Sequence, residues 1–157
     1  MMSRRFRSRM LQRGVAAVEA AFLLVPLVIL LLGIAELGRV FYQYNTIAKA
    51  TRDGARYLSM MVPGTGHATA KCLVVTGSPS CAGSPLVEGL DVAQVSICDA
   101  TTCATTHANV PAEGTGVPSM NLVTVTVTGY RSANFVPVPL PFFDFEPISA
   151  TMRQPRP

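Results

Sequence analysis

Few side chains in this chain have both the type and the position to do chemistry. A single carboxylate, Glu19, stands at the fifth position of a long apolar run that begins at Val15, directly after Gly14. A charged side chain inside a membrane helix costs about 2.5 to 3.5 kcal/mol on insertion scales, so a chain that carries one there is expected to use it. The run therefore predicts a membrane subunit that is processed and assembles with others.

The other reactive side chains are cysteines and histidines, all in residues 60–157. They are Cys72, Cys81, Cys98 and Cys103, with His67 and His107. The cysteine spacings lack the close pairs of a zinc site, and we expect each histidine in a solvated loop. The sequence contains no Ser-His-Asp arrangement, phosphate-binding glycine loop or paired-carboxylate cleft that stands out. We therefore predict no cofactor, no metal and no catalytic site.

The four cysteines instead predict two disulfides. Their number is even, and all of them lie in the part of the chain that follows the apolar run, which suggests an oxidising compartment. Three pairings are possible. We favour Cys72 with Cys81 and Cys98 with Cys103, because short loops bounded by strands bring those ends close. Each bond would stabilise the domain by about 2 to 4 kcal/mol.

The apolar run has the length of a membrane span. Hydrophobic residues make up 49% of the chain and charged residues 14%, and the excess is concentrated in residues 15–35. As a helix, these residues extend about 30 Å, which is the hydrocarbon thickness of a bilayer. We predict a single-pass transmembrane helix over 15–35, with the lipid bilayer as its partner. Pro26 removes one backbone hydrogen bond and predicts a kink in it.

The positive charge of the chain is a local feature of residues 1–14. Five arginines and no acidic residue precede the run, whereas the rest of the chain has 8 basic and 9 acidic residues. A basic tail alone would suggest nucleic acid, but one that adjoins a membrane-length run is typical of the positive-inside rule. We therefore predict a cytoplasmic leader over 1–14, everything after Ala35 across the membrane, and no nucleic-acid partner.

The fold class predicted is α+β: a long N-terminal helix, then a small β-rich domain that bears the disulfides. Apolar residues at helical spacing continue the helix over 36–59 as an amphipathic segment that ends near Ser59. In 60–157, the alternation of Leu122–Thr128 predicts a strand. Further strand candidates are Val92–Cys98, Lys71–Thr76 and Pro147–Met152. Residues 63–70 and 104–119 are expected to be surface loops, and Val136–Pro147 an extended loop or edge.

Residues Gly14 to Arg56, through an ordered series of motifs, resemble the TadE-like family, the minor pilins or pseudopilins of tight-adherence (Flp-type) pili. The series comprises Arg13-Gly14, Ala17-Val18-Glu19, Pro26 with leucines after it, Gly33 to Arg39, and Ala50 to Tyr57. At Asp53 the chain has aspartate where glutamate is commoner in the family. The resemblance covers about 44 of the 157 residues, and the order of the motifs is more specific than any one of them.

The resemblance implies processing and assembly rather than catalysis. A prepilin peptidase would cut after Gly14 and leave Val15 as the new N-terminus. Glu19 would then pair with the terminal amine of a neighbouring subunit and set the register between subunits. The implied partners are that peptidase, other pilin or pseudopilin subunits and an inner-membrane pilus assembly platform. The implied location is the bacterial inner membrane, with the C-terminal domain periplasmic or in an extracellular pilus.

Two alternatives remain open at this point. Residues 1–35 could be the signal peptide of a secreted binding domain or enzyme, since Gly33-Ile34-Ala35 offers small residues for a cut, or they could anchor a periplasmic protein without cleavage. The apolar region of a signal peptide has about 7 to 15 residues, fewer than this run. The helical periodicity also continues past Ala35, which favours the membrane subunit.

Overall fold

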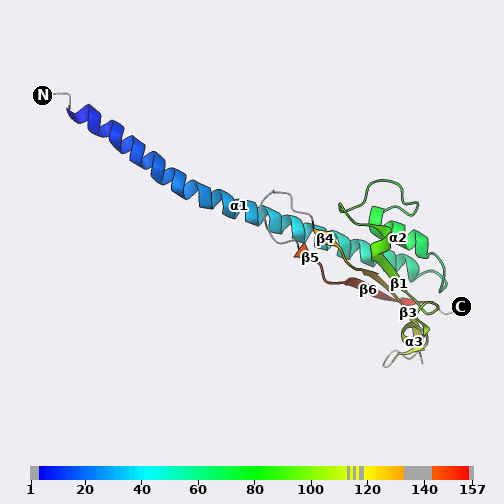
Figure 1. The fold of residues 1–157 in the computed structure, drawn as a ribbon. Coiled ribbons are helices and arrows are strands. Elements are labelled where there is room, and N and C mark those ends of the chain that lie inside the picture. The colour runs from blue at the N-terminus through cyan, green and yellow to red at the C-terminus, as the bar shows by residue number, and fades with distance from the viewer. Residues whose placement is uncertain (1–3, 113, 115, 117–118, 133–142, 156–157) are drawn as a thin grey trace. The chain divides into compact units, whose positions relative to one another are not determined.

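The computed structural model describes residues 4–112, 114, 116, 119–132 and 143–155, with side chains from Val15 onward apart from that of Phe143. The chain divides into two compact units, Met1–Arg39 and Val40–Pro157. A long apolar helix is followed by a small strand-rich unit with two disulfides, so the predicted α+β class is confirmed (Figure 1).

Helix α1 comprises Arg4–Leu58 and changes character along its length. Every side chain from Val15 to Ala35 is exposed. Beyond Val40, buried positions recur every three or four residues, at Gln43, Ile47, Ala50, Thr51, Gly54, Ala55 and Leu58. This spacing is that of an amphipathic helix with one face against a core. The helix ends within one residue of the predicted end and continues through Pro26; the kink stays a prediction.

The C-terminal unit, Val40–Pro157, is built around strand β3, Ser119–Val127. Strands β1 (Val95–Cys98) and β6 (Ile148–Gln154) pair antiparallel with β3 on either side, and β2 (Val110–Pro111) pairs with its first residues. Val123, Val125 and Val127 alternate into a core that they share with Ile47 and Leu58 of α1. The strands predicted at Leu122–Thr128 and Pro147–Met152 are confirmed, whereas Val92–Gln94 forms the 3-10 turn η1 before β1.

Helix α2, His67–Thr76, contradicts two predictions. The strand expected at Lys71–Thr76 is wrong, and so is the loop expected over 63–70 from His67 onward. Val74, Val75 and Thr76 are β-branched and suggested a strand, but packing against α1 overrides that propensity. Helices α1 and α2 pack closely at this point, since a Cβ on Gly54 of α1 would lie 2.6 Å from Cγ2 of Val74.

The remaining elements are short. Helix α3, Ala104–His107, and β2 occupy part of the segment 104–119, so the prediction of a surface loop there is wrong for these residues. Strands β4 (Arg131–Ser132) and β5 (Phe143–Asp144) pair antiparallel. The predicted extended segment Val136–Pro147 lies outside the described residues up to 142, and its described part begins with β5.

Candidate functional site

The residues predicted to act in processing and assembly lie in the first part of α1. Val15 and Glu19 are both exposed, and they are separated by one helical turn, a rise of about 6 Å. The backbone of Gly14 belongs to the same helix, but its side-chain surroundings lie outside the described residues. This arrangement places the carboxylate one turn from the proposed new N-terminus. Cleavage and register remain predictions.

The same helix is the candidate membrane anchor. Among the described residues, α1 is the one helix long and apolar enough to cross a bilayer, and its most apolar stretch has no part buried against the rest of the chain. In water such exposure is unfavourable, because burial of one large apolar side chain stabilises a fold by about 1.5 to 3 kcal/mol and an exposed side chain contributes none of this. The helix is therefore consistent with a single-pass anchor.

Both disulfides form in the pairing that the short loops favoured. Cys72 of α2 bonds Cys81 across a sequence separation of 9, and Cys98 at the end of β1 bonds Cys103 across 5. On loop-closure entropy alone, these bonds stabilise the unit by about 2.5 and about 2 kcal/mol.

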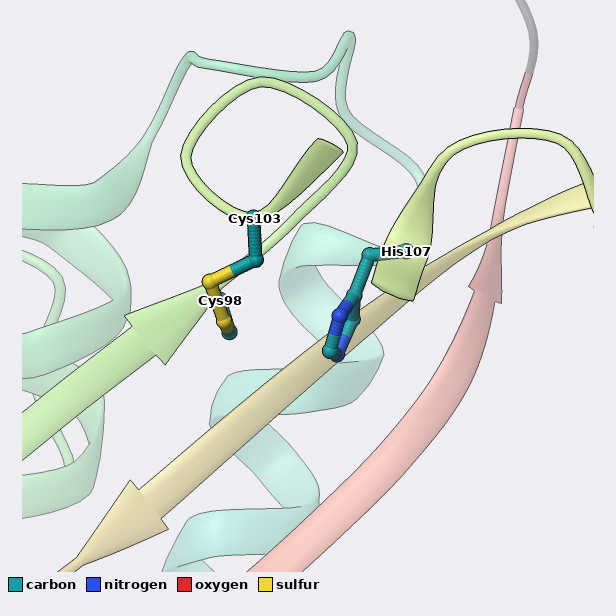
Figure 2. A group of neighbouring side chains, drawn as sticks. All are labelled: Cys98, Cys103 and His107. Atoms are coloured by element: carbon teal, nitrogen blue, oxygen red, sulfur yellow. A yellow bond between two sulfur atoms is a disulfide. The ribbon is translucent and has the colours of Figure 1, made fainter. Parts of the chain in front are cut away.

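His107 lies beside the second disulfide, as Figure 2 shows. The donor atoms of Cys98, Cys103 and His107 lie within 4.8 Å of one another, as in a metal site. However, the two sulfurs are bonded to each other and offer no thiolate. Nδ1 of His107 lies 2.7 Å from Oγ1 of Thr106, and Nε2 lies 2.8 Å from Oγ1 of Thr124. Both nitrogens are thus engaged, and the group is a disulfide beside a hydrogen-bonded histidine.

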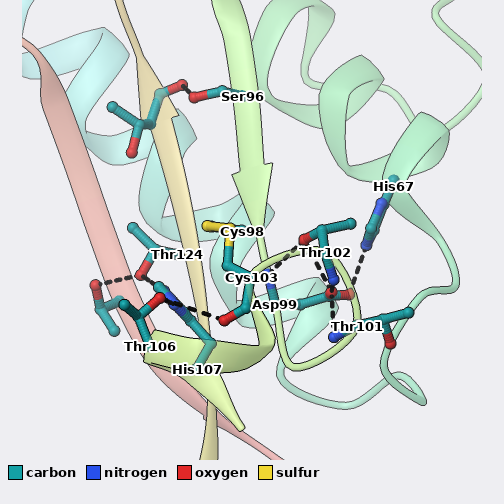
Figure 3. The surroundings of a disulfide bond; sticks show 12 residues. His67, Ser96, Cys98, Asp99, Thr101, Thr102, Cys103, Thr106, His107 and Thr124 are labelled. Carbon is teal, nitrogen blue, oxygen red and sulfur yellow. Dashed lines mark hydrogen bonds and ion pairs between the residues drawn. A yellow bond between two sulfur atoms is a disulfide. The ribbon is translucent and has the colours of Figure 1, made fainter.

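Asp99 is completely buried in the C-terminal unit, and both of its carboxylate oxygens have hydrogen-bond partners. Its Oδ1 accepts hydrogen bonds from the backbone N–H groups of Thr101 and Thr102 at 2.9 and 2.8 Å. Its Oδ2 accepts one from the backbone N–H of Gly64 at 2.7 Å. The same oxygen lies 2.7 Å from Nε2 of His67 (Figure 3). The carboxylate therefore joins the turn after α1, the start of α2 and the loop after β1.

Burial by itself would raise the pKa of Asp99. The hydrogen bonds from Thr102, Gly64, His67 and Thr101 outweigh burial, so the pKa of this carboxyl lies far below its ordinary value. Hydrogen bonds to the charged form of a carboxyl lower its pKa in this way. Asp99 is therefore ionised at neutral pH, and its arrangement serves structure: neither oxygen points at an open site.

The structure corrects the expected surroundings of both histidines. We predicted solvated loops, but His67 begins α2 and His107 ends α3. Sequence reasoning missed Asp99 as the partner of His67, since the two residues are 32 positions apart in the chain. The one local signal is the segment Cys98-Asp99-Ala100-Thr101-Thr102-Cys103. Asp followed by hydroxyl residues in a short loop favours a turn in which the carboxylate binds the next N–H groups.

A groove of about 700 Å³ follows α1 in the C-terminal unit. One wall is formed by Tyr42, Asn45, Thr46, Lys49, Ala50 and Asp53 of α1; the other is formed by Leu73, Gly77 and Leu86. The backbone N–H of Leu86 donates to the carbonyl of Val75 at 2.7 Å, which fixes the second wall. The described lining combines apolar side chains with one cation, Lys49, and one carboxylate, Asp53.

Comparison with known proteins gives one match. The family model described as TadE-like protein matches residues 14–56, just over a quarter of the chain. The matched segment lies within α1 and coincides with the series of motifs from Gly14 to Tyr57, so the resemblance drawn from those motifs is confirmed. No curated protein matches the chain, and no solved structure does.

Proposed function

We propose that this chain, whose residues 14–56 match the TadE-like family, is a pseudopilin that assembles into a tight-adherence pilus or a related secretion apparatus. Its role would be structural. The α1 helix would hold the subunit in the membrane before assembly and pack against the helices of other subunits afterwards. The C-terminal unit would face the periplasm or the filament surface.

One observation carries this proposal: the apolar part of α1 is exposed throughout and bears a single carboxylate. Every side chain from Val15 to Ala35 is exposed, and Glu19 is the one charged residue among them. Such a surface is stable in lipid or against other apolar helices but not in water. A subunit that moves from a bilayer to a helical bundle meets both conditions.

Processing would precede assembly. A prepilin peptidase on the cytoplasmic side would cut after Gly14 and release the arginine-rich leader, residues 1–14. The new α-ammonium of Val15 would carry a positive charge at the membrane boundary. The excess of arginine before the run supports a cytoplasmic N-terminus. This orientation places the two disulfides in a compartment where they persist.

Glu19 would then set the register between subunits. A carboxylate in an apolar environment is costly unless it is paired. The terminal amine of a neighbouring subunit would supply that partner once the helices pack side by side. Because the pair forms in one relative position only, it would select one axial offset among the many that an apolar surface permits.

A substitution at Glu19 tests this proposal. Glu19→Ala is expected to leave membrane insertion and cleavage intact but to reduce recovery of the subunit in sheared pili by at least about tenfold, which corresponds to about 1.4 kcal/mol per contact. Glu146→Ala is the matched control, since that carboxylate is exposed in the C-terminal unit. Normal pili containing the Glu19→Ala subunit would disprove the register role.

The mature N-terminus separates this function from a secreted or signal-anchored domain. The compact C-terminal unit begins at Val40, so a cut after Ala35 would leave it intact. Intact-mass measurement of the protein from cells is expected to give a chain that starts at Val15. A chain that starts at Glu36 would indicate a signal peptide, and one that retains the leader would indicate an uncleaved anchor.

A further inference from the structure

Three potential metal ligands of the C-terminal unit lie together around the loop after β1. Cys98 ends β1, Cys103 directly precedes α3, and His107 is the last residue of α3. Their donor atoms all lie within 4.8 Å of one another, and all three residues are partly buried (Figure 2). Among the described residues this is the one group of at least three such donors, and the other cysteine pair, Cys72 and Cys81, does not belong to it.

Hydrogen bonds restrain the backbone of these residues independently of the disulfide. Cys98 is paired with Thr124 in the register of β1 and β3. The backbone N–H of Cys103 donates to the carbonyl of Asp99 at 2.8 Å, and that of His107 donates to the carbonyl of Cys103 at 2.9 Å. The buried carboxylate of Asp99 also binds two N–H groups within the loop (Figure 3). The three donors are therefore expected to stay together when the S–S bond is absent.

Threonine hydroxyls orient the imidazole ring of His107. Nδ1 lies 2.7 Å from Oγ1 of Thr106, and Nε2 lies 2.8 Å from Oγ1 of Thr124. The hydroxyl of Thr124 lies 2.8 Å from that of Thr151, which extends the chain of polar contacts to β6. A metal-binding histidine almost always uses its second nitrogen in a hydrogen bond that fixes the ring. One nitrogen can therefore exchange its hydroxyl for a metal while the other keeps the ring in place.

We propose that the reduced form of this loop, in which Cys98 and Cys103 are thiols, binds a zinc ion through both sulfurs and one nitrogen of His107. Two thiolates and a neutral imidazole are a donor set that zinc prefers, and water fills the fourth position. Ligands of one tetrahedral zinc ion lie about 3.5 to 3.8 Å apart, so donors already within 4.8 Å need shifts of about 1 to 2 Å. The sequence predicted no metal, because it does not show that His107 joins the two cysteines.

The zinc ion and the disulfide exclude each other, because both use the same two sulfurs. On zinc binding, each thiol releases its proton and forms a Zn–S bond. A disulfide-bearing oxidase then takes two electrons from the two sulfurs and takes up two protons as its own disulfide becomes a dithiol. The S–S bond of the loop forms, both Zn–S bonds break and the ion leaves. The structure with the disulfide is thus the oxidised state of the same group.

Alkylation of the full-length chain tests the site without any substitution. The protein in detergent is reduced with a phosphine, which is then removed under nitrogen, and iodoacetamide is added with or without zinc chloride. Peptide mass spectrometry measures the rate at each cysteine. We expect zinc to slow alkylation of Cys98 and Cys103 at least about tenfold, and that of Cys72 and Cys81 less than about twofold, since a zinc-bound thiolate is a poorer nucleophile than a free one. Equal slowing of both pairs, or none, would overturn the site.

Two matched double variants separate this site from any pair of thiols. Cys72→Ser/Cys81→Ser keeps the proposed ligands, and Cys98→Ser/Cys103→Ser keeps the other two cysteines. Each is reduced, and its affinity for zinc is measured by competition with a chromogenic chelator. We expect the first variant to bind a single zinc ion at least about tenfold more tightly than the second, because only the first has a third ligand. Equal affinities would contradict the proposal.

The role of the histidine is tested in the variant that keeps Cys98 and Cys103. His107→Ala is expected to weaken zinc binding at least about tenfold, because it removes one of three protein ligands. Thr105→Ala is the control, since this exposed residue lies in the same helix α3, and it should change the affinity less than about twofold. Equal affinities of these two variants would overturn the proposed set of ligands.

Discussion

The two parts of α1 use helical structure in opposite ways. From Val15 to Ala35 the helix buries no side chain, whereas from Val40 to Leu58 it places one face in the core of the C-terminal unit. The first part relies on its surroundings to cover apolar surface, and the second part covers that surface within the chain. The first part therefore leaves its apolar surface open to its surroundings, whereas the fold of the C-terminal unit covers that of the second.

Core composition strengthens this contrast. The buried positions of the C-terminal unit are filled mainly by valine and alanine, and among the aromatic residues whose side chains are described only Tyr130 is fully buried. A core of small side chains buries little area per residue, so polar and covalent links become important. The two disulfides and the buried Asp99 supply those links. The apolar part of α1 has no equivalent.

The largest effects are expected when a valine is replaced by aspartate, once in the core of the C-terminal unit and once in the apolar part of α1. Val125→Asp places a carboxylate at a position with no exposure in the core, and we expect it to cost at least about 4 kcal/mol and unfold the C-terminal unit. Val28→Asp places it in the apolar run, where it should oppose insertion by about 3 kcal/mol and leave the unit folded. Membrane fractionation and near-ultraviolet circular dichroism measure the two outcomes separately. Unfolding of the C-terminal unit by Val28→Asp would contradict the separation of roles.

A second prediction concerns the buried carboxylate and pH. Asp99 has a pKa far below its ordinary 3.8, so it stabilises the fold above about pH 4, and that contribution is lost as the pH falls further. Asp99→Asn should lower the free energy of unfolding by about 2 to 3 kcal/mol at neutral pH. The difference from the parent chain should shrink below pH 4.

Guanidinium unfolding of the full chain in detergent, at several pH values, measures this dependence. Asp91→Asn is the control, because that exposed carboxylate caps the 3-10 turn η1 and should cost less than about 1 kcal/mol. A loss at neutral pH no larger for Asp99→Asn than for Asp91→Asn would show that the buried network adds little.

The smallest expected effect is a difference in melting temperature between alanine substitutions at two helical glycines. Gly54→Ala gains helix propensity, about 1 kcal/mol, but its Cβ would lie 2.6 Å from Cγ2 of buried Val74. Overpacking of this kind costs about 1 to 3 kcal/mol, so we expect a net loss of about 1 kcal/mol and a melting temperature lower by about 4 °C. Gly33→Ala has no neighbour within 4 Å and should leave that temperature unchanged. Equal melting temperatures for the two variants would argue against the close packing of α1 on α2.

The sequence predicted those features that depend on local pattern. The alternation of valine and threonine in β3, the apolar run and the end of α1 all follow from periodicity over neighbouring residues. The favoured cysteine pairing follows from loop length. Helix α2 was missed because a short segment with Val74 and Val75 fits either structure, and the contact with Gly54 that decides it comes from a distant part of the chain.

The hydrogen bonds between distant polar residues of the C-terminal unit could not be predicted from the sequence for the same reason. Asp99 and His67 are 32 residues apart, and Ser132 and Gln43 are 89 apart. No local pattern connects such pairs, since each depends on the order in which strands and helices pack. The predicted site residues of α1 depend on no distant contact: Val15 and Glu19 lie one helical turn apart in a single element, and their roles stay predictions.

The connectivity of the two disulfides simplifies biogenesis. Each cysteine bonds the next one along the chain, first with second and third with fourth. When such a polypeptide emerges residue by residue into an oxidising compartment, every bond can close as soon as its second thiol arrives, and the partner is already the native one. In such a compartment, sequential pairing would limit the need to reshuffle mispaired cysteines by thiol–disulfide exchange.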